Sequence, residues 1–151
     1  MRKHLRILLP VGLLLLAAPL LGLPGAAASA AAPSGPTALS GTAAAAFKLP
    51  SDVVPVWSAT YPDGTVQTRY QQRVGNANVL GGQLTVIRNG STTTAVIGAY
   101  YPDLTAKNTR ALNAAQARAV AEKRIGATGK WSTSLMIDPS DARLFYKVEN
   151  R

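Results

Sequence analysis

Few side chains in this sequence are of the types that most often carry out catalysis. The chain has one histidine, His4, and no cysteine. Protein zinc sites are built largely from His and Cys, and Ser-His-Asp and Cys-His systems need a histidine as base. His4 lies in an N-terminal segment that we expect to be removed. The remaining chain is therefore expected to have no catalytic residue, no metal site and no cofactor.

A pair of carboxylates could still support hydrolysis, as in glycosidases. Four of the seven acids lie beside or near Pro or Gly, where an aspartate usually bonds to its own backbone: Asp63, Asp103, Asp138 and Asp141. Asp52 is expected in a similar turn or cap, Glu122 on the exposed side of a helix, and Glu149 near the chain end. No two acids are set together, so a small carboxylate hydrolase is the weaker alternative.

Charge and aromatic content are considered next as signs of a binding surface. Outside residues 1–30 there are 13 Lys and Arg against 7 Asp and Glu, scattered singly along the chain. Such scattering indicates a solvated basic surface and not a nucleic-acid groove. Five aromatic residues could line a sugar-binding face, although packing explains them equally well: Trp57, Tyr61, Tyr100, Tyr101 and Trp131.

The N-terminus has the layout of a secretory signal peptide. A basic start is followed by an uncharged apolar run over residues 7–23 and then by small residues. Cleavage is expected after Ala30, with Ala28 as the second choice. An uncleaved membrane anchor is disfavoured because prolines interrupt the run. The mature protein is thus predicted to be secreted and free of the membrane, and the lack of cysteine weakly favours a bacterial source.

The elements up to residue 100 are predicted to be mainly strands. Residues 31–50 form a flexible lead-in with a short helix over 43–47, and Pro55 makes 53–57 an edge or bulged strand. A turn at 61–64 leads to a strand at 65–73, and a second turn at 75–78 leads to a strand at 79–88. Gly81 and Gly82 mark a bulge or a close approach of the backbone. Asn89-Gly90 predicts a type I′ hairpin turn before a strand over 92–100.

The last third predicts one helix and a hairpin. Asn113 and Gln116 have capping-box spacing, and Gly126 ends the helix. Ala117, Val120, Ala121 and Ile125 share one helical face, and Arg118 can pair with Glu122. Strands at 131–137 and 143–148 flank a turn at 138–141. The fold class is therefore α+β: an antiparallel β-meander with a helix packed on it, then a helix and β-hairpin subdomain.

The strand pair with its turns resembles the FTP domain, which is found in pro-regions of secreted fungalysin and thermolysin-like metallopeptidases. The resemblance is carried by residues 68–72 (TRYQQ), 78–86 (NVLGGQLTV) and the following Asn-Gly turn. Asn78 stands where the family has proline, and Leu80 where it has an aromatic residue. The positions that match are Tyr70, Gln72, Val79, Gly81, Gly82, Asn89 and Gly90.

The resemblance extends past the meander. Residues 101–104 (YPDL) are similar to the family's connector, and residues 112–117 and 144–148 are similar to the helix start and a strand of the adjoining PepSY-like segment. It implies a cystatin-like or PepSY-like fold, with a signal peptide at 1–30, a lead-in at 31–50, an FTP-like domain at 51–109 and a PepSY-like segment at 110–151. That segment is expected to be incomplete at its C-terminus.

The resemblance implies a non-catalytic pro-region that acts as an intramolecular chaperone and inhibitor of a metallopeptidase. The zinc-binding His-Glu-x-x-His motif of the peptidase is absent from this sequence. The expected partner is a secreted metallopeptidase domain, in cis or, for a stand-alone inhibitor, in trans. The expected contact surface is either the open face of the sheet or an exposed edge strand. The matching Gln and Gly residues are expected to be architectural, with Gln bonding to backbone and Gly forming the bulge.

Overall fold

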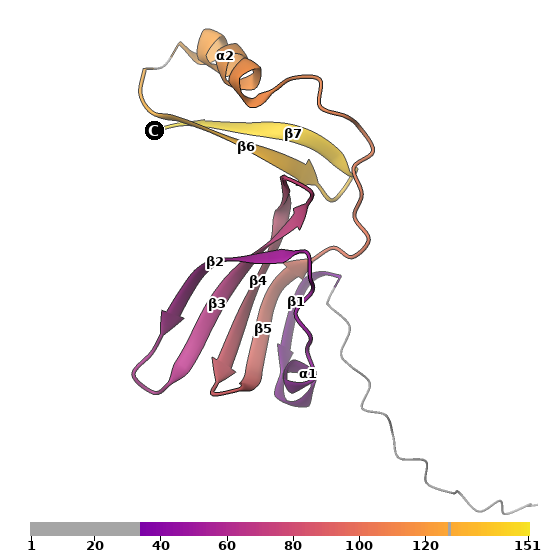
Figure 1. Ribbon diagram of the computed structural model, residues 1–151, viewed down its shortest axis with the longest axis vertical. Coiled ribbons are helices and arrows are strands. Elements are labelled where there is room, and N and C mark those ends of the chain that lie inside the picture. Colours follow the sequence, from indigo (N-terminus) through magenta and orange to yellow (C-terminus); the bar gives the residue numbers. More distant parts are fainter. Residues whose placement is uncertain (1–33, 127) are drawn as a thin grey trace, which may run out of the picture.

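The computed structural model describes residues 34–151 except residue 127 (Figure 1). The predicted signal peptide, with Ala28 and Ala30, lies outside the described residues. In chain order the elements are β1 (Gly35–Ser40), α1 (Gly41–Ala45), β2 (Val53–Thr60), β3 (Thr65–Val74), β4 (Ala77–Asn89), β5 (Thr92–Tyr100), α2 (Ala114–Ile125), β6 (Trp131–Asp138) and β7 (Arg143–Asn150). The predicted α+β class is confirmed.

The first five strands form an antiparallel sheet in the order β1-β5-β4-β3-β2. We call these strands with α1 the meander unit. Tight turns connect β2 to β3, β3 to β4 and β4 to β5. At 61–64 the Tyr61 N–H donates to the Thr65 carbonyl at 2.8 Å, and Gly64 has a φ of 81° that suits glycine. Pro55 lies in the edge strand β2 beside a bulge, as predicted, because an edge position leaves its missing donor without consequence.

The core of the meander unit lies between the sheet and the segment containing α1. Its buried residues are Phe47, Val53, Tyr70, Leu84, Val86, Val96 and Tyr100, with Leu39 packed against them. Tyr70, Leu84 and Val96 come from three adjacent strands and project to one side of the sheet, because alternate residues of a strand share a face. The opposite face of this sheet has no helix over it in Figure 1.

The remaining elements form what we call the hairpin unit, residues 104–151. Helix α2 begins with the predicted capping box, in which the Gln116 N–H donates to Asn113 Oδ1 and the Asn113 N–H donates to Gln116 Oε1, both at 2.9 Å. It ends at Gly126, whose φ of 65° is left-handed. Strands β6 and β7 pair in register from Trp131↔Asn150 to Asp138↔Arg143, and α2 lies along one face of this hairpin (Figure 1).

Strand β4 joins the two units. Beyond its pairing in the meander, it pairs in parallel with β6 at Asn78↔Met136 and Val79↔Ile137. A second core cluster forms at this junction around the buried residues Ala77, Val79 and Ile137. No helix among the described residues is long and apolar enough to cross a membrane.

Two details of the meander differ from expectation. Residues 35–40 form strand β1 along the edge of β5, where the sequence predicts a flexible lead-in. Pairing with β5 and the packing of Leu39 outweigh the weak strand preference of this small-residue segment. The short helix in the lead-in is present, at Gly41–Ala45.

The hairpin turn after β4 is also of a different type from the one predicted. Asn89 pairs with Thr92, so the two central residues are Gly90 and Ser91, and Asn89 belongs to the strand. Gly90 has a φ of 57°, whereas neither Asn89 nor Ser91 has a positive φ. A positive φ at the first central residue alone is the type II′ pattern, for which a glycine in that place is suited. The hairpin was predicted in the right place, but the type I′ assignment was wrong.

Candidate functional site

The residues that carry the family resemblance gather mostly at one place, the wide bulge between β3 and β4. Gln71 pairs with Gln83 and Arg73 pairs with Asn78, so residues 79–82 bulge out opposite Gln72. Tyr70 precedes the bulge and is part of the first core cluster. Asn89 and Gly90 are not part of this place, since they lie at the other end of β4.

Gln72 is buried at 1% exposure and ties three segments together. Its Nε2 donates to the Tyr101 carbonyl at 2.7 Å and to Asp52 Oδ2 at 2.9 Å, while its Oε1 accepts from the Tyr101 N–H at 3.0 Å. The Tyr100 hydroxyl donates to Asp52 Oδ1 at 2.9 Å. Asp52 therefore does more than the expected turn or cap, because both of its oxygens hold groups from distant parts of the chain.

The environment of Tyr100 changes its acidity. Burial disfavours the charged phenolate, and the hydrogen bond to Asp52 favours the protonated form, so the pKa of Tyr100 is raised to about 12. The hydroxyl is a hydrogen-bond donor in this network. The network joins Asp52, just before β2, to β3 and to the end of β5.

Gln71 was not singled out in the sequence, yet it holds the bulge itself. Its Nε2 donates to the carbonyl oxygens of Val79 at 2.9 Å and Gly82 at 3.0 Å, and its Oε1 accepts from Gln83 Nε2 at 2.9 Å. Its side chain is buried, although glutamine is a residue type that is mostly exposed. The adjacent pair of glutamines in a strand before two glycines was the signal available.

The two glycines of the bulge have different requirements. Gly81 has a φ of 71°, a left-handed backbone that glycine adopts without penalty. Gly82 has no such φ, but a Cβ there would meet Val79 Cβ at 2.7 Å and Val79 Cγ1 at 2.8 Å. Gly81 is thus needed for its backbone conformation and Gly82 for its lack of a side chain.

Three of the acidic residues are held within their own turns. Asp63, Asp138 and Asp141 accept hydrogen bonds from nearby backbone N–H groups within their turns, as predicted. Hydrogen bonds from Thr65 and Ser140 lower the pKa values of Asp63 and Asp138, respectively. Among the described residues, no group of three or more His, Cys, Asp or Glu is placed to hold a metal ion.

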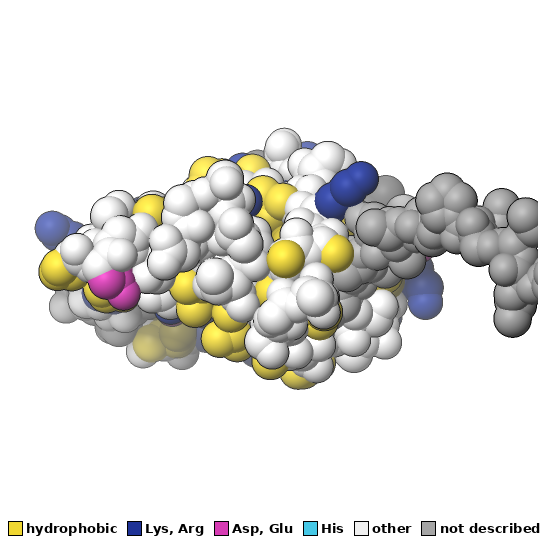
Figure 2. All heavy atoms as spheres, turned by 90° about the horizontal axis from the view of Figure 1, so that it is seen from below, with side chains coloured by type: hydrophobic (Ala, Val, Ile, Leu, Met, Phe, Trp, Pro, Cys, Tyr) yellow, Lys and Arg dark blue, Asp and Glu magenta, His cyan; other side chains and the backbone are white. Residues whose placement is uncertain are grey.

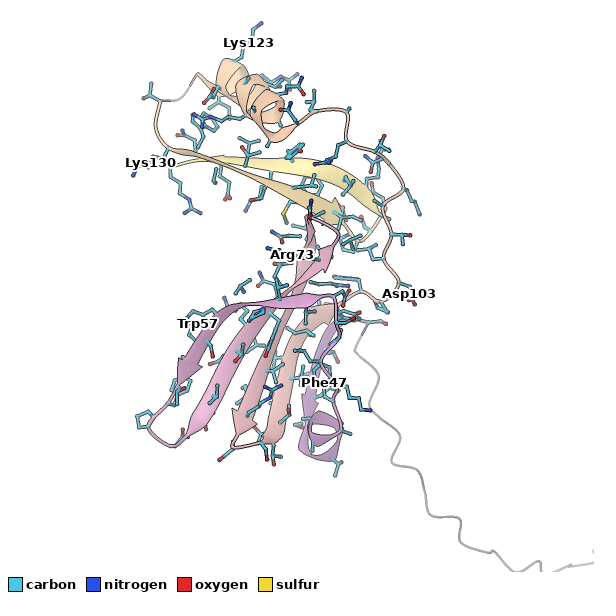
Figure 3. The ribbon with its side chains drawn as sticks, viewed as in Figure 1. Phe47, Trp57, Arg73, Asp103, Lys123 and Lys130 are labelled. Atoms are coloured by element: carbon cyan, nitrogen blue, oxygen red, sulfur yellow. The ribbon has the colours of Figure 1, made fainter. Side chains whose placement is uncertain are left out.

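The five aromatic residues do not form one sugar-binding face. Trp57 and Tyr61 are 46% and 45% exposed at the β2 edge of the meander, where Arg69 lies over the Trp57 ring at 5.9 Å and the Tyr61 hydroxyl donates to Gln67. Figure 3 shows Trp57 on β2 at the edge of the sheet opposite α1. Tyr100 is buried in the core, and Trp131 belongs to β6 in the other unit. From the end of the meander unit that carries its turns, hydrophobic side chains reach the surface at separate places (Figure 2).

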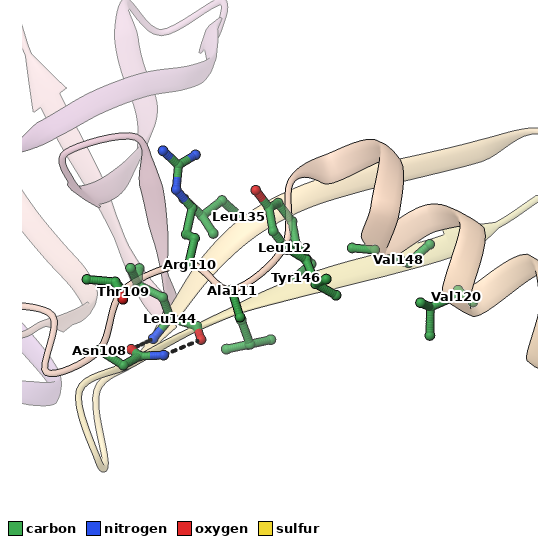
Figure 4. Close-up of a pocket in the computed structure, with 13 residues that line it drawn as sticks. Asn108, Thr109, Arg110, Ala111, Leu112, Val120, Leu135, Leu144, Tyr146 and Val148 are labelled. Atoms are coloured by element: carbon green, nitrogen blue, oxygen red, sulfur yellow. Dashed lines mark hydrogen bonds between the residues drawn. The ribbon is translucent and has the colours of Figure 1, made fainter.

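A groove of about 480 Å³ lies between α2, the connector before it and the β6–β7 hairpin (Figure 4). Its walls are mostly apolar, with Leu112, Val120 and Tyr146 among the lining residues. The helix covers the hairpin only in part. Of the predicted apolar face, Ala117 is buried, but Val120 and Ile125 are 52% and 63% exposed.

One wall of the groove is the outer edge of β7. The Leu144 N–H donates to Asn108 Oδ1 at 2.6 Å, and Asn108 Nδ2 donates to the Leu144 carbonyl at 3.2 Å (Figure 4). Just before it, the Lys107 N–H donates to the Ala142 carbonyl at 2.8 Å. The connector therefore covers the first part of this edge, as a neighbouring strand would.

The positive charge is concentrated in the hairpin unit. Residues 104–151 contain nine Lys and Arg against four Asp and Glu, whereas residues 34–103 contain four against three. Arg118 and Lys147 form ion pairs with Glu122 and Glu149, respectively. Arg110 lines the groove and makes no ion pair within the part of the chain that the structure describes. The apolar groove thus lies in the more basic of the two units.

Comparison with known proteins gives no assignment: no family model matches the chain, and no curated protein is significantly similar to it.

Proposed function

We propose that the chain is the non-catalytic pro-region of a secreted zinc metallopeptidase of the thermolysin or fungalysin type. In this role it binds the peptidase domain, assists its folding and inhibits it until it is removed. The chain itself is not an enzyme and uses no cofactor. A stand-alone secreted inhibitor that acts in trans is the alternative.

The observation that carries the proposal is the open groove of the hairpin unit. A small domain usually buries the apolar face of its helix, and an exposed apolar groove with a polar rim is a common feature of protein-binding surfaces. Here Val120 and Ile125 remain exposed beside a groove of about 480 Å³. This surface lies within the PepSY-like part of the resemblance, and it suits a protein that acts on another polypeptide.

The resemblance is supported by the role of its motif residues. Gln72, Gly81 and Gly82 take part in one bulge that fixes the end of β5 and the junction with β6. A motif that builds such a junction is a sign of a shared fold, because these residue types are needed there together.

Physically, a partner that binds only the folded peptidase stabilises that state by mass action. Covalent attachment would raise its effective concentration further. The experiment mixes the purified chain with a thermolysin-like peptidase and measures peptide hydrolysis. A parallel measurement follows the yield of active peptidase after dilution from denaturant.

The expected result is saturable inhibition together with a higher refolding yield. A matched protein, the variant Val120→Asp, places a charge in the groove and should be a weaker inhibitor with unchanged unfolding free energy. No inhibition and no refolding gain at high micromolar concentration would overturn the proposal.

A further inference from the structure

We propose that the free edge of β7 accepts an extended, acidic segment of another polypeptide as an additional strand. Apolar side chains of that segment enter the groove beneath α2. The inference rests on the proposed function only in taking the partner to be a polypeptide, and it names the surface and the chemistry of the contact.

The hydrogen-bonding pattern of the hairpin leaves donors and acceptors free along this edge. Lys130 and Arg151 exchange two backbone hydrogen bonds, of 2.9 and 2.8 Å, so they form a hydrogen-bonded pair. Such pairs alternate along an antiparallel ladder. Tyr146 and Val148, opposite Leu135 and Thr133, are therefore in non-hydrogen-bonded pairs, and their N–H and C=O groups point away from β6.

The connector shows what a strand at this edge would do. Leu144 is the preceding outward-pointing residue, and the amide of Asn108 satisfies both its N–H and its carbonyl. A side-chain amide has the same donor and acceptor as a peptide group. Among the described residues, the N–H and C=O groups of Tyr146 and Val148 make no such bonds, so the edge is occupied at its start and open beyond it.

The groove adds side-chain recognition to this edge. Leu144, Tyr146 and Val148 share the face of the hairpin that lines the groove, opposite the helix residues Val120 and Ala121. Every second side chain of a strand added beside β7 would project to that same face. Backbone pairing then supplies affinity, and alternate apolar side chains in the groove supply specificity.

The positive charge of the hairpin unit favours an acidic segment at this edge. Residues 104–151 carry a net charge of +5, and Arg110 at the groove has no carboxylate partner among the described residues. Two copies of the chain meeting edge to edge would bring two such units together, which like-charge repulsion disfavours. An acidic segment with alternating apolar residues matches both the charge and the groove.

The first test uses a fluorescent peptide of about six residues, the usual length of a strand, in which valine alternates with glutamate. Anisotropy is measured with the full chain at low and moderate salt. Binding that weakens with salt is expected, and a matching peptide with lysine for glutamate should bind at least about tenfold more weakly, a difference of about 1.4 kcal/mol. Equal binding of the two peptides would contradict the assignment of an acidic partner.

Two N-methylated forms of the acidic peptide test the backbone pairing. Methyl groups on alternate amides block one edge of the peptide and leave its side chains unchanged. One form, with methyls on the edge that meets β7, should lose binding, and the other should retain it. If both forms bind as well as the unmethylated peptide, strand addition is wrong.

A pair of protein variants gives a second test. Val148→Pro removes an outward N–H and keeps the β6 pairing, whereas Val148→Ala keeps that N–H and shortens the side chain. We expect the proline variant to bind the acidic peptide about tenfold more weakly and the alanine variant to lose less affinity. Circular dichroism should show that both variants are folded. Inhibition of a peptidase without binding of the acidic peptide would overturn this inference and leave the proposed function standing. Binding of the acidic peptide without inhibition or chaperoning of the peptidase would overturn the proposed function and leave this inference standing.

Discussion

The side chain of Gln72 and the backbone of Tyr101 form two hydrogen bonds, 2.7 and 3.0 Å long, between residues 29 positions apart. Tyr101, the residue that follows β5, is thereby held against β3, although β4 separates β5 from β3 in the sheet. The same glutamine donates to Asp52, so one side chain connects β3, the segment before β2 and the residue after β5.

Replacing Gln72 with leucine should destabilise the protein strongly. The change leaves the partly buried Tyr101 N–H and one partly buried Asp52 oxygen without their partner, and each lost partner costs about 1–3 kcal/mol. We expect the free energy of unfolding in urea to fall by about 3 kcal/mol. Gln67→Leu on β3 removes the hydrogen bond from the exposed Tyr61 hydroxyl and serves as the control, with an expected change of less than about 1 kcal/mol. Similar losses for both variants would disprove the special role of Gln72.

The two bulge glycines should respond differently to the same substitution. Asparagine adopts a left-handed backbone more readily than other residues with a side chain, so Gly81→Asn should cost about 1 kcal/mol. Gly82→Asn forces a Cβ against Val79 and should cost at least about 2 kcal/mol. Thermal unfolding of the two variants side by side measures the difference. The reverse order would show that the backbone of Gly81 is the stricter requirement.

The raised pKa of Tyr100 predicts a loss of stability at alkaline pH. The ordinary tyrosine pKa is 10.0 and the folded value is about 12, so the folded protein binds this proton more tightly than the unfolded chain. The contribution is fully present below pH 10 and is lost as the pH rises from 10 to 12. Tyr100→Phe should flatten this part of the stability curve. It should also remove the ionisation near pH 12 from an ultraviolet absorbance titration, and a titration that the variant leaves unchanged would refute the assignment.

The capping box of α2 should have a measurable local effect. Asn113→Ala removes the acceptor for the Gln116 N–H and should cost about 1 kcal/mol, whereas Asn113→Ser keeps an acceptor and should cost little. Amide hydrogen exchange of the first turn of α2 reports the difference directly. Because the helix forms one wall of the groove, the alanine variant should also bind the acidic peptide more weakly. Equal exchange in the two variants would show that packing alone holds this end of the helix.

The elements with strong local signals were predictable from the sequence. The turn at 61–64, the capping pair Asn113 and Gln116, and Gly126 each combine a residue type with a backbone need, and the structure contains all three. The Gly81-Gly82 bulge was predicted for the same reason. Such features depend on a few neighbouring residues and not on the rest of the fold.

The features that depend on distant partners were not predictable in this way. Strand β1 consists mainly of small residues and exists because β5 offers an edge to pair with. The role of Asp52 arises from Gln72 and Tyr100, which lie 20 and 48 residues away. The exposure of Val120 and Ile125 follows from how far α2 reaches over the hairpin, which helical periodicity does not report. The groove therefore appears only in three dimensions.

Strand β4 is 13 residues long and is shared by the meander and hairpin units. Its parallel contact with β6 covers only two registered positions, Asn78↔Met136 and Val79↔Ile137, which makes it a narrow seam in an otherwise continuous sheet. A pairing this short fixes the point at which the two units meet. The angle between the units then depends on the side chains packed around Ile137. Substitutions in that cluster are therefore expected to change how the two units are oriented, while the strand pairing within each unit stays intact.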